Sequence, residues 1–274
     1  MIADDLPLIT CVMVTEGRWP LMKKSIDCYL NQSYMNKNLV ILSQGSNEIN
    51  FLIEDYVSKH NDITFLSVPK RLSLGALRNL SVEIATGDII CQWDDDDLYH
   101  PHRIITQYKN LSMNENNSAS IYCDFLKYFK LKNTIYWCDW SGEPPLINKF
   151  LCGSVMFWKR FFYDFMPFYP EKGNQSNKEE DLHVLSKLKS KGILCPVFVG
   201  HQYIYVYHGD NTYDLKHHKY TLDTSSGKKV YSTNELFEKK DLLIETFKLT
   251  NIDTNLFVSS LDECAFIYKE NNEV

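Results

Sequence analysis

Short runs of apolar residues alternate with amphipathic stretches over the first hundred residues. Each run is continuous rather than alternating, which is typical of strands that are buried on both faces of a sheet. The four strands predicted in this way are residues 8–14, 39–42, 63–68 and 88–93.

Three helices are expected between these strands. Pro20 opens the first, a polar helix through Ile53 and Val57 is the second, and Ser73 caps the third, which Thr86-Gly87 ends. This order predicts an α/β fold: a Rossmann-like, mostly parallel central sheet flanked by helices.

The second half of the chain is less regular. We expect further helices after Pro101 and over about 179–189, and strands at 119–130, 134–140, 193–198 and 203–207. Beyond residue 216 the chain is polar, with one helical pattern at 236–249. The predicted organisation is therefore one domain over residues 1–215 and a partly helical C-terminal extension over residues 216–274.

Composition and charge restrict the class of protein. With 274 residues, 44% of them hydrophobic, the chain is long enough for one large domain. The net charge is −6 and Lys and Arg are dispersed, so no basic stripe indicates a nucleic-acid partner.

The eight cysteines form no Cys-x-x-Cys pair, and several lie in apolar runs, which favours buried thiols in a reducing cytosol over disulfides or zinc sites. Asp4 and Asp5 interrupt any signal peptide, and no stretch reaches the roughly 18 apolar residues of a membrane span. We expect a cytoplasmic protein, and peripheral association with a membrane stays open.

Four consecutive acids, Asp94-Asp95-Asp96-Asp97, follow directly on the strand predicted at 88–93. Their charges repel one another, so a solvated acidic loop is the simplest alternative to a functional role. However, open α/β sheets bind ligands at the carboxyl ends of their strands, where this run lies. Hard carboxylate oxygens suit Mg²⁺ or Mn²⁺, so the run predicts a cation site.

Around this run the sequence resembles the family 2 glycosyltransferases of the GT-A fold. Trp93 to Leu98 followed by His100-Pro101 is similar to the family's Asp-x-Asp region. Four further segments match in the same order: the first strand and helix (residues 9–34), Gly75-Ala76-Leu77-Arg78-Asn79 with Ala85 to Asp88, Glu180-Asp181, and Tyr207 to Thr212. The resemblance covers about residues 7–215 and implies a GT-A transferase that uses a nucleotide-sugar donor with Mn²⁺ or Mg²⁺.

The resemblance assigns roles to the acidic residues. Asp96 and Asp94 are the expected metal ligands, with Asp94 and Asp95 also near the donor, and Asp95 and Asp97 as supporting residues. His208 is expected as a third metal ligand or a diphosphate contact, and a structural histidine is an equal alternative. Asp181, with Glu180, is the candidate general base for the acceptor hydroxyl, although both residues could simply favour a helix N-terminus.

The remaining candidates lie on the donor and acceptor sides. Donor-binding residues are expected at Thr15, Glu16, Arg18, Gln44, Arg78 and Asn79. Acceptor-binding residues are expected at Gly153, Ser154 and Trp140, although core packing is the commoner role of a tryptophan. Ser43-Gln44-Gly45-Ser46 departs from the family's Asp-Asp-Gly-Ser, and Thr15 to Arg18 departs from its Thr-Tyr-Asn-Arg, so the donor nucleotide stays open.

The sequence thus predicts a metal-dependent, inverting glycosyltransferase whose acceptor is a glycan or glycolipid. Two alternatives remain. A nucleotidyltransferase also places carboxylates and a metal at a sheet edge, but it normally has a Gly- and Lys/Arg-rich loop after the first strand. A non-catalytic nucleotide- or glycan-binding module is the other alternative. The sequence does not indicate the oligomeric state.

Overall fold

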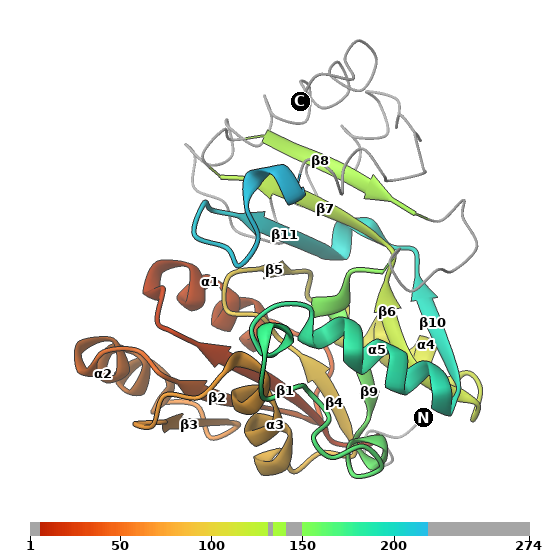
Figure 1. The fold of residues 1–274 in the computed structure, drawn as a ribbon, viewed down its shortest axis with the longest axis horizontal. Coiled ribbons are helices and arrows are strands. Elements are labelled where there is room, and N and C mark those ends of the chain that lie inside the picture. The colour runs from red at the N-terminus through yellow and green to blue at the C-terminus, as the bar shows by residue number, and fades with distance from the viewer. Residues whose placement is uncertain (1–5, 131–133, 141–149, 219–274) are drawn as a thin grey trace.

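A seven-stranded sheet forms the centre of the computed structural model, which describes residues 6–130, 134–140 and 150–218. The strand order is β10-β6-β9-β4-β1-β2-β3 (Figure 1). The strands are β1 (Ile9–Thr15), β2 (Lys37–Ser43), β3 (Ile63–Ser67), β4 (Ile89–Gln92), β6 (Asn117–Tyr122), β9 (Met156–Trp158) and β10 (Ile193–Val197).

The first four predicted strands are confirmed and are parallel to one another. Cys11, in the middle of β1, lies opposite Leu39 of β2 and Cys91 of β4, and β2 pairs with β3. Every residue of β1 and β4 is buried, as the continuous apolar runs predict for strands covered on both faces. The predicted α/β fold with a mostly parallel sheet is therefore confirmed.

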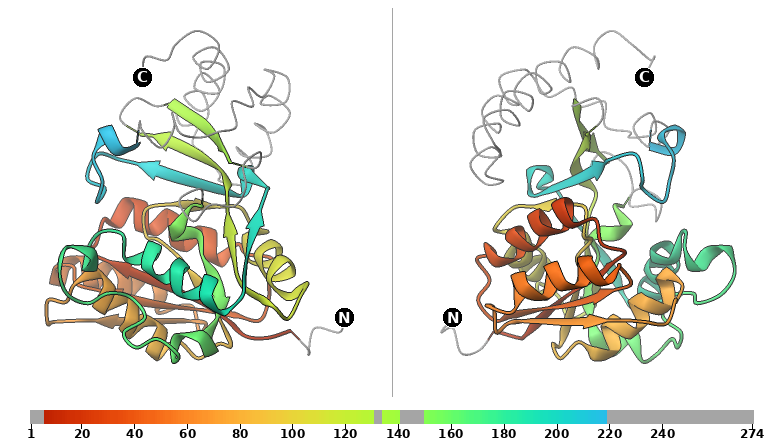
Figure 2. Two further views of the ribbon diagram at one scale, coloured as in Figure 1. Left: turned by 45° about the vertical axis from the view of Figure 1, so that its right-hand side comes forward. Right: turned by 90° about the vertical axis from the view of Figure 1, so that its left-hand side faces the viewer.

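In the part of the chain that the structure describes, five α-helices cover the two faces of this sheet. One face carries α1 (Trp19–Leu30), α2 (Asn47–Val57) and α4 (Arg103–Ser112), and the other carries α3 (Leu74–Ile84) and α5 (Glu180–Lys191) (Figures 1 and 2). The predicted Ser73 cap is confirmed, because its hydroxyl accepts a hydrogen bond from the backbone of Ala76.

Two features of the central sheet were not predicted. β9 lies between β4 and β6 and is antiparallel to both. In addition, the single strand predicted at 119–130 is two strands, β6 and β7 (Asp124–Phe129), which belong to different sheets and meet at Cys123. A continuous apolar run does not reveal such a change of sheet, because both strands are buried.

A second sheet lies over the carboxyl edge of the parallel strands. Its order is β5-β11-β7-β8 (Figure 1), with β5 (Leu98–Tyr99), β8 (Thr134–Asp139) and β11 (Tyr203–Tyr207) joining β7. Residues 93–97 connect β4 of the first sheet to β5 of the second, so the acidic run is placed between the two sheets.

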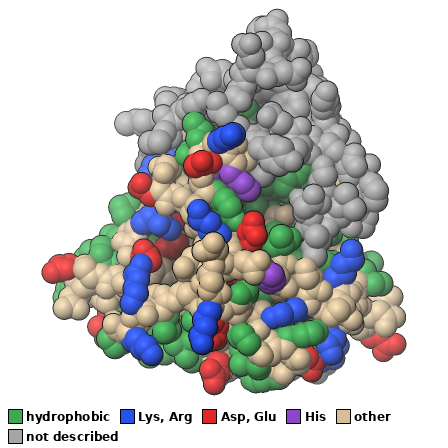
Figure 3. All heavy atoms as spheres, in the orientation of Figure 1, with side chains coloured by type: hydrophobic (Ala, Val, Ile, Leu, Met, Phe, Trp, Pro, Cys, Tyr) green, Lys and Arg blue, Asp and Glu red, His purple; other side chains and the backbone are tan. Residues whose placement is uncertain are grey.

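The surface and the helices add two observations. On the face drawn in Figure 3, Lys and Arg side chains lie among Asp and Glu side chains rather than in one stripe. Among the described residues, none of the helices has the length and apolar character needed to cross a membrane. Most of the predicted C-terminal extension, including its helix at 236–249, lies outside the described residues.

Candidate active site

A cleft of about 1000 Å³ opens between the carboxyl edge of the central sheet and the second sheet. Its lining includes most of the residues proposed from the sequence: Thr15, Glu16, Arg18, Gln44, Arg78, Asp94, Asp95, Asp96, Trp140, Gly153, Glu180 and Asp181. Residues that are far apart in the sequence therefore meet in one concave site, which is where ligands usually bind.

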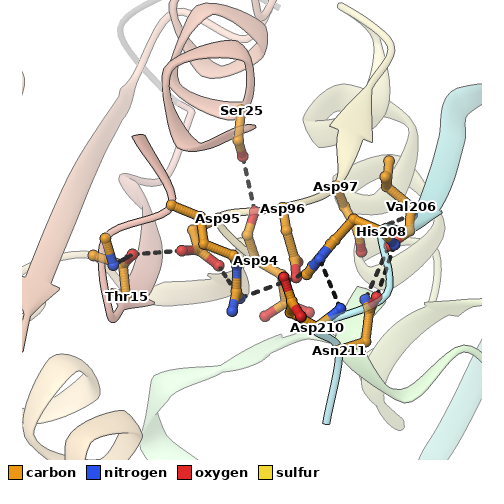
Figure 4. A network of polar contacts seen from close by, with 12 residues as sticks. Thr15, Ser25, Asp94, Asp95, Asp96, Asp97, Val206, His208, Asp210 and Asn211 are labelled. Atoms are coloured by element: carbon orange, nitrogen blue, oxygen red, sulfur yellow. Dashed lines mark hydrogen bonds and ion pairs between the residues drawn. The ribbon is translucent and has the colours of Figure 1, made fainter. Parts of the chain in front are cut away.

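Burial alternates along the acidic run at the centre of this cleft. Asp94 and Asp96 are partly exposed, whereas Asp95 and Asp97 are buried. Figure 4 shows the run between Thr15 and Ser25 on one side and the segment from Val206 to Asn211 on the other. The backbone is held as well, since the carbonyl of Asp94 accepts from the Ser25 hydroxyl at 2.8 Å. Alternate side chains therefore have different surroundings.

The two buried carboxylates, Asp95 and Asp97, hold the acidic run in place through hydrogen bonds. The Thr15 hydroxyl donates to Asp95, which also lies 3.4 Å from Arg18 Nη2. Asp97 accepts from the Tyr203 hydroxyl at 2.7 Å and from the backbone of Val206 at 2.8 Å. Burial and the neighbouring Asp96 raise the pKa of Asp95 to about 7 and that of Asp97 well above its usual range. These contacts tie the run to β1 and β11.

Asp94 is paired with a buried arginine. Arg78 of α3 donates from Nη2 to Asp94 Oδ1 (3.1 Å) and from Nε to Glu180 Oε1 (3.2 Å). The Gln92 amide completes this cluster, with its oxygen accepting from Arg78 Nη1 at 3.0 Å and its nitrogen donating to the Tyr169 hydroxyl at 3.2 Å. Burial opposes the charge on Arg78, but Asp94 and Glu180 outweigh it and raise its pKa. Arg78 therefore stays cationic in the cleft.

Gly153 fits closely against the same carboxylate. A Cβ atom built at this position would lie 2.5 Å from Asp94 Oδ2, which is closer than real Cβ contacts come. The sequence analysis placed Gly153 near the acceptor, where a glycine would permit close approach of a ligand. The atom that approaches it in the structure is the oxygen of Asp94, so the glycine makes room for the acidic run.

Asp96 lies between a cation and a histidine. Arg18 Nη2 is 3.2 Å from Asp96 Oδ2, and His208 Nε2 is 3.0 Å from the same oxygen. His208 Nδ1 accepts from the backbone N–H of Asp210 at 3.3 Å, which places the ring proton on Nε2. His208 therefore donates to Asp96 in this arrangement, and Asn211 holds its backbone by accepting from His208 N at 2.9 Å.

Glu180 and Asp181 occupy different environments at the start of α5. Glu180 is buried against Arg78, and burial together with Asp181 raises its pKa to about 7. Asp181 is only partly buried and lines the cleft, and among the described residues none forms a hydrogen bond with its carboxylate. Of the two candidate bases, Asp181 is thus the one whose oxygens are free to meet a ligand.

Two of the residues predicted as ligand contacts have their side chains bonded to neighbouring loops. Asn79 is buried, donates to the Tyr169 carbonyl (2.9 Å) and to Glu171 (2.9 Å), and accepts from the Tyr169 backbone (2.8 Å). Ser154 is fully buried, and its hydroxyl donates to the Leu151 carbonyl and accepts from the Tyr122 backbone. The side chains of Asn79 and Ser154 therefore hold loops in place, and neither residue is among those that line the cleft.

One end of the cleft lies beyond Thr15. Gln44 pairs with the backbone of Leu72, accepting from its N–H at 2.7 Å and donating to its carbonyl at 3.3 Å. Glu16 and Arg71 form an exposed ion pair beside it. The amide of Gln44 thus supports the 71–73 loop, and the charged groups at this end are Glu16 and Arg71.

The opposite end of the cleft is aromatic. Trp140 is buried and packs edge-to-face on Phe125, with the ring centroids 5.4 Å apart. Lys127 and Tyr205, which were not predicted, line the same end, and burial lowers the pKa of Lys127. No sequence pattern indicated these two residues, because β7 and β11 pair only in the folded second sheet.

Arg103, also not predicted, lies wholly buried behind the acidic run. Its Nη2 donates to the carbonyl of Gln92 at 2.7 Å, and its guanidinium lies 4.2 Å from the ring centroid of Tyr99. The ring centroids of Trp93 and Tyr203 are 4.8 and 4.9 Å away. The Arg103 guanidinium supports the strand end that carries Asp94. Its position shortly after His100-Pro101 was the one sequence feature that could have indicated this residue.

The cleft carboxylates suit a divalent cation that is coordinated jointly by protein carboxylates and by phosphate oxygens of a ligand. Among the described residues, no three His, Cys, Asp or Glu side chains form a group that could hold a metal alone. Mg²⁺ in enzymes is usually held by one or two carboxylates together with substrate phosphates. The partly exposed Asp94 and Asp96 are suited to that kind of site.

Comparison of the sequence with known families agrees with this geometry. The family model described as glycosyl transferase family 2 matches residues 10–172, more than half of the chain. The chain is 31% identical over 115 residues to an uncharacterized glycosyltransferase of Methanocaldococcus jannaschii, covering 41% of this chain and 40% of the relative. It is 33% identical over 100 residues to a putative colanic acid biosynthesis glycosyl transferase of Escherichia coli, covering 36% of each. The match thus spans less than half of either relative.

Solved structures share the fold at low sequence identity. A mannosyltransferase of Pyrobaculum calidifontis, in complex with GDP-Man and Mn²⁺, superposes with a TM-score of 0.57 at 12% identity, covering 98% of this chain and 77% of that one. TarS of S. aureus, in complex with UDP-GlcNAc, gives a TM-score of 0.59 at 10% identity, with coverages of 94% and 72%. These similarities confirm the GT-A type of architecture.

Proposed function

The chain belongs to glycosyl transferase family 2, and from this premise we propose that it transfers a sugar, with inversion, from a nucleoside-diphosphate donor to a hydroxyl of a glycan or glycolipid. The observation that carries the proposal is the meeting of three groups in one cleft. These are the partly exposed Asp94 and Asp96, the cationic Arg78, and the unengaged carboxylate of Asp181.

The charges in the cleft support a metal-dependent donor site. Among the described residues, eight Asp or Glu and five Lys or Arg line it, so acids outnumber cations before any donor arrives. A diphosphate would be repelled by this excess unless a cation accompanied it. Mn²⁺ or Mg²⁺ held by Asp96 and Asp94 would supply Lewis-acid stabilisation of the diphosphate leaving group.

The residues around the acidic run have donor-side roles in this proposal. Arg78 stabilises negative charge that develops on the leaving diphosphate, and Glu180 and Gln92 orient it. Arg18 and His208 orient Asp96, and His208 Nε2–H can also donate to a phosphate oxygen. Thr15 fixes Asp95, while Glu16 and Gln44 border the nucleoside end.

Asp181 acts as the general base in this proposal. An acceptor hydroxyl becomes a good nucleophile only as its proton is removed, and a placed carboxylate contributes about 10²–10⁴-fold to such a step. The hydroxyl oxygen attacks the anomeric carbon, the bond to the diphosphate breaks, and the proton passes to Asp181. The acceptor lies toward Gly153 and the aromatic end with Trp140.

The donor half of the proposal is tested by thermal unfolding with nucleoside diphosphates, with and without Mn²⁺. A ligand at about 100 times its Kd stabilises the folded state by roughly 2.7 kcal/mol, which raises Tm by several degrees in a domain of this size. We expect one base to stabilise the protein, only with metal, and Asp96→Asn to abolish the effect. A panel without any metal-dependent shift would refute the donor site.

The transfer half is tested with Asp181→Asn. We expect this variant to keep donor binding and to lose transfer by about 10²-fold or more. Retained turnover would exclude Asp181 as the base. The products separate the alternative functions: a nucleotidyltransferase releases pyrophosphate rather than a nucleoside diphosphate, and a binding module binds donor without turnover of any acceptor.

A further inference from the structure

The edge of the central sheet opposite the cleft carries both exposed apolar and basic side chains. The backbone leaves β9 at Trp158, which pairs with Ile89 at the amino end of β4. α5 likewise starts at the cleft and ends at this edge with Lys191. We define the aromatic-basic surface as residues 158–168 together with residues 186–193.

Three large apolar side chains of this surface face solvent. Tyr163 and Met166 are each 60% exposed and Ile193 is 53% exposed. Phe161 and Phe165 lie partly buried beneath them, packed against the core. Isolated exposed apolar residues are common, but a group of them on neighbouring segments marks an interaction site.

Contacts between the two segments make the surface continuous. Lys191 Nζ is 2.9 Å from Asp164 Oδ2 and 5.1 Å from the centroid of the Phe165 ring. Lys187 Nζ donates to the carbonyls of Pro167 and Phe168 at 2.6 and 2.8 Å. The end of α5 and the loop after β9 therefore form one face (Figure 1).

The two segments that form this face are basic, whereas the chain as a whole is acidic. Its segments hold five basic residues, Lys159, Arg160, Lys187, Lys189 and Lys191, and one acid, Asp164, a net charge of +4 in a chain of net charge −6. Arg160 extends over the rings of Trp158 and Phe161, 5.3 and 5.0 Å from their centroids. Aromatic and Met side chains surrounded by cations are the combination that binds the interface of an anionic bilayer.

We propose that the aromatic-basic surface docks the protein on an anionic phospholipid surface. Tyr163 and Met166 enter the headgroup region, and Arg160, Lys189 and Lys191 meet the lipid phosphates. Because β1 is seven residues long, the cleft between the two sheets then lies about 20 Å from the bilayer.

The test is co-sedimentation of the full chain with phosphatidylcholine vesicles that do or do not contain phosphatidylglycerol. We expect binding only to the anionic vesicles, weakening with salt. Replacing Arg160, Lys189 and Lys191 together by Gln should weaken binding by roughly two orders of magnitude. The pair Tyr163→Ser and Met166→Ser should weaken it about tenfold and leave the salt dependence unchanged.

Phe51→Ser with Leu66→Ser is the matched control, because these exposed apolar residues lie outside the surface. It should bind vesicles as the unaltered chain does. Circular dichroism confirms that each variant is folded. Equal binding by all variants, binding to neutral vesicles, or a dimer lost in the Tyr163/Met166 variant without any vesicle binding would each overturn the proposal. Donor-induced thermal stabilisation is measured separately, so failure of docking does not bear on the proposed transfer.

Discussion

Gly153→Ala perturbs the acidic run by a single added methyl group. The new Cβ would lie 2.5 Å from Asp94 Oδ2, whereas ordinary contacts begin near 3.4 Å, so the carboxylate must retreat by about 0.9 Å. This movement pulls Asp94 Oδ1 away from Arg78 Nη2, now at 3.1 Å. A misplacement of about 1 Å in an active site can cost roughly 10²-fold in rate, or about 2.7 kcal/mol.

The same geometry predicts a small effect on folding. The clashing atom is the end of a side chain at the border of a cleft, so it can move without disturbing backbone. We expect kcat/KM for sugar transfer to fall about 100-fold while the free energy of unfolding changes by less than about 1 kcal/mol. Released nucleoside diphosphate measures the first quantity and urea unfolding the second.

A double-mutant cycle on donor affinity shows whether Asp94 carries the effect. If the methyl group acts through this carboxylate, Gly153→Ala should weaken donor binding in the unaltered chain and have little further effect in Asp94→Asn. Additive losses, or a Gly153→Ala variant within threefold of normal activity, would refute the reasoning.

Three further predictions concern buried residues. Asn79→Ala should lower the free energy of unfolding by about 2–4 kcal/mol, since it leaves the Tyr169 N–H and carbonyl unpaired. The donor Kd should stay unchanged, and a weaker Kd at an unchanged Tm would contradict the prediction. Glu180 has a folded pKa of about 7, above its unfolded value, so its contribution to stability is present at low pH and is lost as pH rises through 7. Glu180→Gln should remove that loss of stability between pH 5 and 8 in thermal unfolding, and an unchanged pH profile would count against the prediction. Arg103→Lys should destabilise the protein by about 2–4 kcal/mol, because Lys cannot both reach the Gln92 carbonyl and stack on Tyr99. A free energy of unfolding in urea within about 0.5 kcal/mol of that of the unaltered chain would disprove the prediction.

The part of the fold that sequence predicts well is the part with regular hydrophobic periodicity. β1 to β4 and their helices follow from continuous apolar runs, helix spacing and caps such as Ser73. β9 has three residues inside a long aromatic stretch, and its direction depends on which strands it joins. The break at Cys123 likewise follows from strand pairing across the two sheets, which local pattern does not encode.

The candidate site divides in a similar way. Residues that directly follow strands, such as Thr15 and Asp94, could be placed from the sequence because parallel strands end at one edge. The hydrogen bonds of Asn79 could not be predicted from the sequence, because its partner Tyr169 is 90 positions away and lies on an irregular loop. Gly153 was expected near the acceptor, but only the structure identifies Asp94 Oδ2 as an atom that closely approaches it.

The alternation of burial along the acidic run explains how four neighbouring carboxylates can coexist. A solvated acidic loop would leave all four side chains exposed and unpartnered. Here the buried pair is bonded to groups on β1 and β11, while Asp94 and Asp96 meet Arg78 and Arg18 at the cleft. Each carboxylate therefore has at least one partner from another segment of the chain, and the two that remain accessible are separated by one residue. In the proposed donor site, tertiary partners thus hold every second side chain of the acidic run away from the ligand.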